Sequence, residues 1–124
     1  MAIQKQRVVV LGASPKRERY SNRAVRLLHQ HGHDVLPINP AASSIEGLTV
    51  FHDLNDLTGH VDTVTVYVSP KRSSTLAESL VGLRPDRVIF NPGAENPDLQ
   101  KRLEACGIHT EDACTLVLLS TGQF

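Results

Sequence analysis

The hydrophobic and polar residues of this chain follow two alternating patterns, short apolar runs and helical stripes. Residues 7–11 form a largely β-branched run that stops at Gly12, which is typical of a strand buried on both faces of a parallel sheet. From Ser21 to His31 the apolar residues fall on one helical face, with Ser21 as the expected N-cap and Gly32 as the stop. This segment therefore predicts a strand, a glycine turn and a helix.

The same alternation continues along the rest of the chain. Further strands are predicted over residues 34–38, 48–51, 63–68 and 87–90. A helix after residue 70 carries a leucine stripe behind a Thr75/Glu78 capping box, and a later helix begins at the N-cap Asn96 and has Cys106 on its apolar face. Strands that alternate with helices of this length predict an α/β fold with a mostly parallel sheet and helices on both faces.

Length and composition fit a single domain. The 124 residues, of which 40% are hydrophobic, are enough to fill one core without disulfides or metals, so we expect residues 1–124 to form one domain. In a parallel sheet of this kind, ligands bind outside the carboxyl ends of the strands. That rule selects four segments as candidates for a binding site: residues 12–17, 39–40, 69–70 and 91–95.

The turn after the first strand suits a phosphate group but does not carry the dinucleotide motif. A strand that ends in glycine and leads into a helix presents backbone N–H groups and the positive end of the helix dipole. The motif G-x-G-x-x-G requires glycines at 12, 14 and 17, whereas the chain has Gly12, Ser14 and Arg17. The acid that holds the ribose of NAD at the end of the second strand is replaced by Asn39-Pro40. An NAD site is therefore disfavoured.

Charge is balanced over the whole chain but uneven along it. Lys plus Arg and Asp plus Glu both total 13, so no overall field attracts nucleic acid or an anionic membrane. Seven of the basic residues and only one acid precede His31, and Lys16, Arg17 and Arg19 lie beside the first turn. Two interpretations stay open, a solvated helix face and a local site for a ligand with several phosphates.

The sequence indicates a cytoplasmic protein. Two cysteines are too few for a disulfide framework, and the N-terminal segment lacks the apolar stretch of a secretory signal. No window approaches the roughly 18 consecutive apolar residues of a membrane-spanning helix. His29, His31 and His33 do not predict a metal site, because Gly32 interrupts the helix and no cysteine or acid stands at a matching ligand spacing.

Candidates for catalysis are weaker than candidates for binding. Cys114 follows Glu111 and Asp112, which disfavour the thiolate, so we interpret it as a structural or ligand-adjacent cysteine rather than a nucleophile. Cys106 is expected in the core. Glu95 and Asp112 are the acids that could act as an acid/base pair, but no pattern in the sequence places them together.

Several short motifs together resemble one known family. They are the phrases Val10-Leu-Gly-Ala-Ser-Pro15, Tyr20-Ser21, Val35-Leu-Pro-Ile-Asn-Pro40, Val68-Ser69-Pro70 and Glu111-Asp-Ala-Cys114. From about Val8 to Cys114 the chain resembles the small stand-alone CoA-binding proteins related to the N-terminal domain of the succinyl-CoA synthetase alpha subunit. The resemblance implies a Rossmann-like three-layer sandwich with coenzyme A across the strand ends.

The resemblance also implies a set of cofactor-binding residues. It places the phosphates of CoA near the first turn and the adenine side near the later loops. Many relatives carry a basic pair just before the proline of the loop that follows the strand predicted over residues 63–68. In this chain that proline is Pro70, which Val68-Ser69 precede and Lys71-Arg72 follow. The residues expected to bind CoA are Gly12, Ala13, Ser14, Lys16, Arg17, Ser21, Asn39, Pro40, Ser69, Pro70 and Cys114.

Two classes of function follow from these observations. The first is non-catalytic binding of coenzyme A or an acyl-CoA, as a carrier or as a sensor that relays occupancy to a protein partner. The second is an enzyme that acts on a nucleotide or an acyl-CoA, which is the weaker hypothesis because the chain has neither a Ser-His-Asp order nor a nucleophile elbow. In the synthetase, catalysis depends on a phosphorylated histidine in a separate domain that has no counterpart here.

Overall fold

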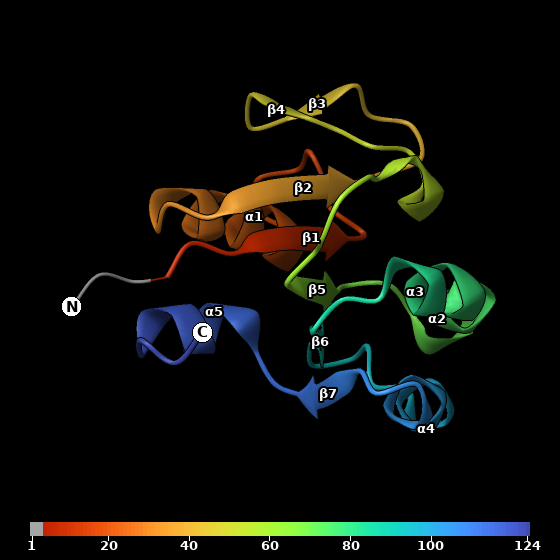
Figure 1. Ribbon diagram of the computed structural model, residues 1–124. Coiled ribbons are helices and arrows are strands. Elements are labelled where there is room, and N and C mark those ends of the chain that lie inside the picture. Colours follow the sequence, from red (N-terminus) through yellow and green to blue (C-terminus); the bar gives the residue numbers. More distant parts are fainter. Residues whose placement is uncertain (1–3) are drawn as a thin grey trace.

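Five parallel strands form the central sheet of the protein (Figure 1). The computed structural model describes residues 4–124. The strand order is β2-β1-β5-β6-β7, so the chain builds β2 on one side of β1 and then crosses to the other side. The strands are β1 (Arg7–Leu11), β2 (Asp34–Ile38), β5 (Thr63–Val66), β6 (Arg87–Phe90) and β7 (His109–Asp112).

Helices cover both faces of this sheet. On one side lie α1 (Tyr20–Gln30) and α5 (Thr115–Ser120), and on the other lie α2 (Pro70–Thr75), α3 (Ala77–Leu83) and α4 (Pro97–Ala105) (Figure 1). Side chains of β1 alternate between two cores, Val8 and Val10 facing α1 and α5, and Val9 and Leu11 facing the other layer. The expected α/β, Rossmann-like three-layer fold is confirmed.

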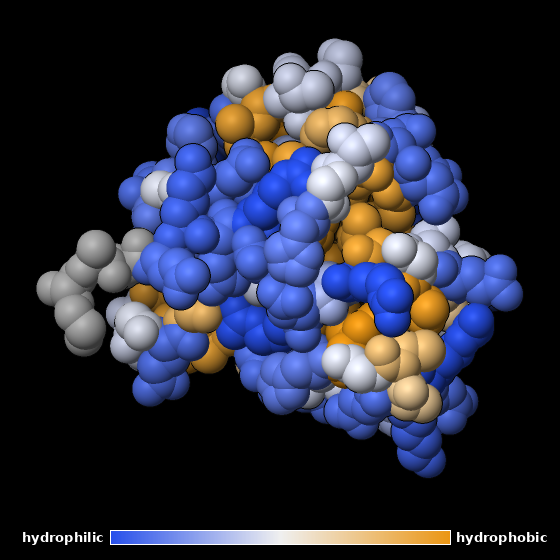
Figure 2. All heavy atoms as spheres, viewed as in Figure 1, coloured by the Kyte–Doolittle hydropathy of each residue, from blue (hydrophilic) through white to orange (hydrophobic). Residues whose placement is uncertain are grey.

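Apolar side chains are not completely covered on the face drawn in Figure 2. Hydrophilic residues occupy most of this surface, and apolar groups emerge at its top and in a band right of centre that runs down to the region of α2 and α3. Leu76, Val81 and Leu83 are partly buried there and pack against the core. Within residues 4–124, none of the helices has the length and the apolar character needed to cross a membrane.

The predicted third strand belongs to a separate hairpin. Residues 48–51 contribute only β4 (Leu48–Thr49), which pairs antiparallel with β3 (Ser44–Ile45). The turn between them has positive φ at both Glu46 and Gly47, the conformation of a tight two-residue hairpin. Ile45 is almost completely buried and anchors the hairpin against the α1 side of the sheet. Phe51 then runs parallel to the end of β2, bridging to Ile38.

Two predicted helix starts are wrong. Helix α1 begins at Tyr20 rather than after Ser21, which lies buried inside the helix, because a turn closed by the Arg19 N–H on the Lys16 carbonyl (3.1 Å) already leads into it. The helix after residue 70 breaks at Leu76 into α2 and α3. The Thr75/Glu78 capping box does not form, because the Thr75 hydroxyl donates to the Arg72 carbonyl at 2.6 Å.

Helix α4 begins as expected and ends slightly differently. The Asn96 side chain accepts a hydrogen bond from the Leu99 N–H at 3.2 Å, which confirms its role as N-cap. Cys106 was predicted in the core but is exposed. It lies at the C-cap, where the backbone has left the helical path, and Leu103 and Ile108 fill the core instead. A helical stripe extended one residue too far accounts for the error.

A histidine and an aromatic ring close the amino-terminal edge of the sheet near β1. His33 is 4% exposed, and its Nδ1 accepts a hydrogen bond from the Gln6 N–H at 3.1 Å. The Phe124 ring contacts two groups: its centroid is 5.3 Å from the centroid of the His33 ring and 4.6 Å from the Arg87 guanidinium carbon. Burial, followed by the charges of His31 and Arg87, lowers the pKa of His33.

We expect this histidine to make the fold sensitive to acid. The pKa of His33 is lower in the folded protein than in the unfolded chain, so its contribution is complete above the unfolded value of about 6.5 and is lost as the pH falls below it. Denaturant titrations at about pH 7.5 and about pH 5 should show a smaller loss of stability in His33→Gln than in the native protein. His29→Gln removes an exposed histidine and should keep the native difference; equal losses in all three proteins would contradict the assignment.

Candidate ligand-binding site at the carboxyl edge of the sheet

A cleft of about 790 Å³ opens at the carboxyl ends of the strands. It lies where the chain, having built β2 beside β1, returns to build β5 on the other side of β1, which is the usual ligand position in such sheets. Its volume is in the range of small-molecule and cofactor sites. The walls come from four loops, residues 11–21, 38–40, 67–72 and 91–94, although not every residue of these ranges reaches the cleft.

The first loop passes directly over the end of β5. Gly12 has φ +88°, and a Cβ atom there would lie 2.7 Å from Val68 Cγ1 and 3.2 Å from the Tyr67 carbonyl carbon. Only glycine combines this backbone conformation with so close an approach. The Ala13 N–H donates to the Ile38 carbonyl at 3.0 Å, which ties the same loop to the end of β2. The loop is thus fixed on both sides.

Asn39 and Asn22 hold the first loop through their side chains. The Asn39 amide nitrogen donates to the Ala13 carbonyl at 2.9 Å, while its oxygen accepts from the Ala41 and Ala42 N–H groups, both at 2.8 Å. Asn22 is completely buried, and its amide nitrogen donates to the Ser14 carbonyl at 2.9 Å. Asn39 was expected as a binding residue, and its amide groups are used to join two loops; Asn22 was not anticipated.

Three cations line the cleft without a carboxylate partner. They are Lys16, Arg19 and Arg72, and within residues 4–124 none of them forms an ion pair. The residues that line the cleft include no Asp or Glu. The cleft therefore has a positive lining that favours an anion, and its position beside the start of α1 adds the positive end of that helix.

Of the eleven residues predicted to bind, eight line the cleft. These are Gly12, Ala13, Ser14, Lys16, Ser21, Asn39, Pro40 and Ser69. Arg17 is turned toward the hairpin, where its guanidinium lies 3.6 Å from a Glu46 oxygen. Pro70 starts α2, and its carbonyl accepts from the Asn96 side chain at 3.1 Å. Cys114 is the N-cap residue of α5, two positions after β7.

Arg19 and Arg72 had weaker signals in the sequence. Arg19 belongs to the basic group after the first strand, and Arg72 to the pair after Pro70. Arg72 reaches the cleft because α2 starts at Pro70, with the Ser69 hydroxyl accepting from the Arg72 N–H at 3.3 Å. A sequence pattern that places the start of α2 also places Arg72 in its first turn, so this cation was within reach of the prediction.

A buried polar network supports the part of the cleft that is lined by Tyr67 and Asn91. Asn91 is 2% exposed; its amide nitrogen donates to the Thr65 hydroxyl at 2.7 Å, and its oxygen accepts from the Thr115 N–H at 2.9 Å. The Tyr67 hydroxyl is buried beside this network and has no hydrogen-bond partner among the described residues. Burial, together with the nearby Cys114, raises the pKa of Tyr67 to about 12, while the neighbouring Thr115 and Thr65 hydroxyls act in the opposite direction.

The side chains that line the cleft are mainly apolar groups, hydroxyls, amides and cations. A phenol with a pKa of about 12 stays protonated at neutral pH and does not act as a base. The lining residues contain serine hydroxyls but no carboxylate, imidazole or thiol that could activate them. Glu95, one of the acids considered for acid/base chemistry, accepts from the Gly93 N–H at 2.8 Å in its own loop, and no hydrogen bond joins it to Asp112 within the described chain.

Comparisons with known proteins agree with this geometry. Residues 6–120 match the protein family described as CoA binding domain. The uncharacterized protein YneT of Bacillus subtilis (strain 168) is 24% identical over 103 residues, 82% of this chain and 75% of YneT. The crystal structure of an uncharacterized protein is 37% identical, with a TM-score of 0.92 over 98% of this chain and 100% of that one.

A larger enzyme contains a domain of the same fold. The apo form of dinucleotide forming acetyl-coenzyme A synthetase 1 from Ca. Korarchaeum cryptofilum is 19% identical, with a TM-score of 0.74. The match covers 85% of this chain and 25% of the synthetase chain. At this identity the likeness concerns the fold.

The close approach at Gly12 predicts a difference between two glycine substitutions. Gly12→Ala and Gly32→Ala both force alanine into positive φ, which costs roughly 1–2 kcal/mol. A Cβ at Gly32 meets no atom within 4 Å, whereas at Gly12 it overlaps Val68, which adds about 1–3 kcal/mol. Chemical denaturation should therefore show a larger loss of stability for Gly12→Ala. Equal losses would mean that the first loop does not pack against β5 in this way.

Proposed function

This chain belongs to the CoA binding domain family, and from that premise we propose that it binds coenzyme A or an acyl-CoA in the cleft, without converting it. The observation that carries the proposal is the set of three cations, Lys16, Arg19 and Arg72, that face the cleft and form no ion pair with any of the described residues. CoA carries a diphosphate and a ribose phosphate, which is the kind of ligand such a lining favours.

The proposed placement follows the loops of the cleft. The diphosphate lies near the backbone of Gly12, Ala13 and Ser14, with Lys16 beside it, and the adenine side extends toward the loops after β2 and β5. Backbone N–H groups near the start of α1 favour the phosphates there. Asn39 contributes chiefly by holding the first loop in position, since its amide oxygen and one amide hydrogen are already used within the protein.

A binding role without turnover is supported by the absence of an activated group among the cleft residues. In that role the protein serves as a carrier of CoA or as a sensor of its acyl state. The alternative is an enzyme that acts on an acyl-CoA or a nucleotide. An enzyme would consume an acyl-CoA during incubation, whereas a binding protein would return it unchanged, and mass spectrometry of the ligand distinguishes the two outcomes.

A cytoplasmic location stays a prediction.

The proposal predicts a preference for CoA over NAD. A ligand at about 100 times its dissociation constant stabilises a protein by about 2.7 kcal/mol, so CoA should raise the thermal midpoint clearly. NAD at the same concentration should raise it less, because Ser14 and Asn39 stand where the dinucleotide motif has a glycine and an acid. Pantetheine, which lacks the phosphates, serves as the control and should have little effect. A rise with NAD that equals or exceeds the rise with CoA would contradict the proposal.

The cations of the cleft should control affinity. A charge-assisted phosphate contact contributes roughly 1.5–3 kcal/mol, so Lys16→Ala and Arg72→Ala should each weaken CoA binding by about tenfold or more in a calorimetric titration. Arg17→Ala should have a smaller effect, because Arg17 faces Glu46. Arg102→Ala removes an exposed arginine that pairs with Glu78 outside the cleft and is the matched control. Unchanged affinity in both Lys16→Ala and Arg72→Ala would mean that the phosphates lie elsewhere.

A further inference from the structure

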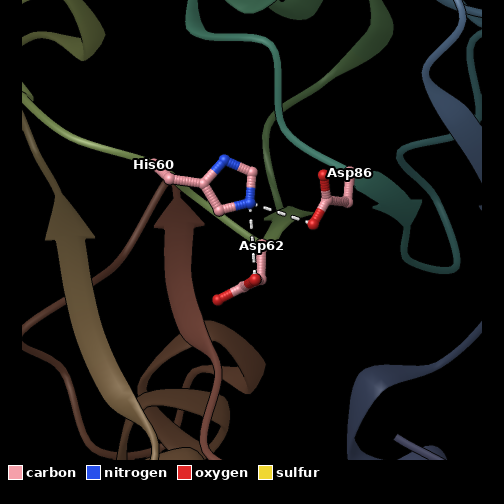
Figure 3. Close-up of side chains that lie close together, drawn as sticks. All are labelled: His60, Asp62 and Asp86. Carbon is pink, nitrogen blue, oxygen red and sulfur yellow. Dashed lines mark hydrogen bonds and ion pairs between the residues drawn. The ribbon is translucent and has the colours of Figure 1, made fainter.

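Three potential metal ligands converge at the edge of the sheet opposite the cleft. His60 and Asp62 lie just before β5, and Asp86 lies just before β6. The His60 Nε2 is 3.0 Å from an Asp86 oxygen and 3.5 Å from an Asp62 oxygen, and the three ligand atoms lie within 4.8 Å of one another. Figure 3 shows the imidazole directed at both carboxylates. This cluster has no part in the proposed binding of CoA.

Two of the three separations match a single small cation, and the third, between the carboxylate oxygens of Asp62 and Asp86, is within 4.8 Å. Ligand atoms placed about 2.0–2.1 Å from Zn²⁺ in a tetrahedral arrangement lie about 3.3 Å from one another. The two separations from His60 Nε2, 3.0 and 3.5 Å, fall on either side of this value. An ion can therefore be bound through small side-chain rotations, and water can occupy the remaining position because all three side chains are partly exposed, His60 and Asp86 by 60% and 64%.

The backbone holds the ligands in place without the ion. The Asp62 carboxylate accepts from the Arg7 N–H through its other oxygen, at 2.7 Å, which leaves the first oxygen directed at His60. The Arg87 N–H donates to the Asp62 carbonyl at 3.0 Å, joining the two loops that carry the ligands. The Arg7 guanidinium donates to the His60 carbonyl at 3.0 Å and so fixes the third ligand. Orientation of this kind by surrounding groups strengthens metal sites.

Charge and donor type favour a divalent transition metal. Two carboxylates balance the charge of a divalent ion, and the nearby Arg7 guanidinium is engaged with the carbonyls of Thr58 and His60 and lies 3.7 Å from Asp34. One imidazole nitrogen with two carboxylate oxygens suits Zn²⁺ and its neighbours better than Ca²⁺ or Mg²⁺, which prefer oxygen ligands alone. We propose that His60, Asp62 and Asp86 form a binding site for a divalent transition-metal ion of the Zn²⁺ class, which links the loops before β5 and β6.

Calorimetric titration of the full chain with Zn²⁺ tests this proposal. The native protein should bind one Zn²⁺ ion. In both His60→Ala and Asp86→Asn this binding should be lost or its affinity reduced by at least about tenfold, since even changes to residues around the ligands weaken metal sites by about 10- to 100-fold. His109→Ala is the matched control. It removes an exposed histidine that also lies beside a carboxylate, 3.2 Å from Glu111, but belongs to no group of three potential ligands among residues 4–124. This variant should therefore bind Zn²⁺ as the native protein does.

Cobalt spectra identify the ligands independently of affinity. Co²⁺ bound by one nitrogen and two carboxylates should give visible absorption without the charge-transfer band of thiolate ligation, which excludes Cys106 and Cys114 as the source. Both variants replace exposed side chains, and circular dichroism checks that they fold. The proposal is overturned by absence of saturable binding in the native protein, by an affinity for Zn²⁺ that does not fall in His60→Ala and Asp86→Asn, or by a thiolate band. In those cases the cluster is an ion pair only.

Discussion

The contact between the first loop and the end of β5 determines most of the cleft. Because β1 is an interior strand with β2 and β5 on opposite sides of it, the loop that follows β1 turns across the neighbouring strand to reach α1. It does so at Gly12, where the absence of a side chain lets the backbone pass against Val68 and Tyr67. Any Cβ would push the loops after β1 and β5 apart. Lys16 and Arg72, which line the cleft from those two loops, would then move apart.

Buried asparagines maintain this arrangement where the strands end and regular backbone pairing stops. Asn22, Asn91 and Asn96 are each at most 5% exposed, and each bridges a loop to a second element through its amide. A buried backbone carbonyl without a partner is costly, and an amide side chain supplies the missing donor. The loops of the cleft are therefore held by polar contacts with specific geometry rather than by apolar packing alone, which suits a site formed before its ligand arrives.

The strands and the edge that carries the site could be predicted because both depend on local patterns. Fully buried strands appear as continuous apolar runs, and glycine or proline marks where they end. The break at Leu76 was missed because no Gly or Pro marks it in the sequence. The exposure of Cys106 was missed because the helical stripe was extended into the C-cap, directly before Gly107, where the backbone has left the helix. The cluster around Asp62 and Asp86 depends on the pairing of Thr63 with Arg87, a register that only the strand order provides.

The position of β1 between β2 and β5 also has a consequence for synthesis on the ribosome. Strand β1 pairs with β2 within about the first forty residues. Its other edge pairs with β5, from Val8 opposite Thr63 to Leu11 opposite Val66, and β5 is translated later. Until that later segment emerges, the nascent chain presents an apolar strand with one row of unpaired backbone groups, which is prone to associate with other chains. The exposed edge of β1 is therefore covered only after β5 has been translated, about fifty residues later along the chain.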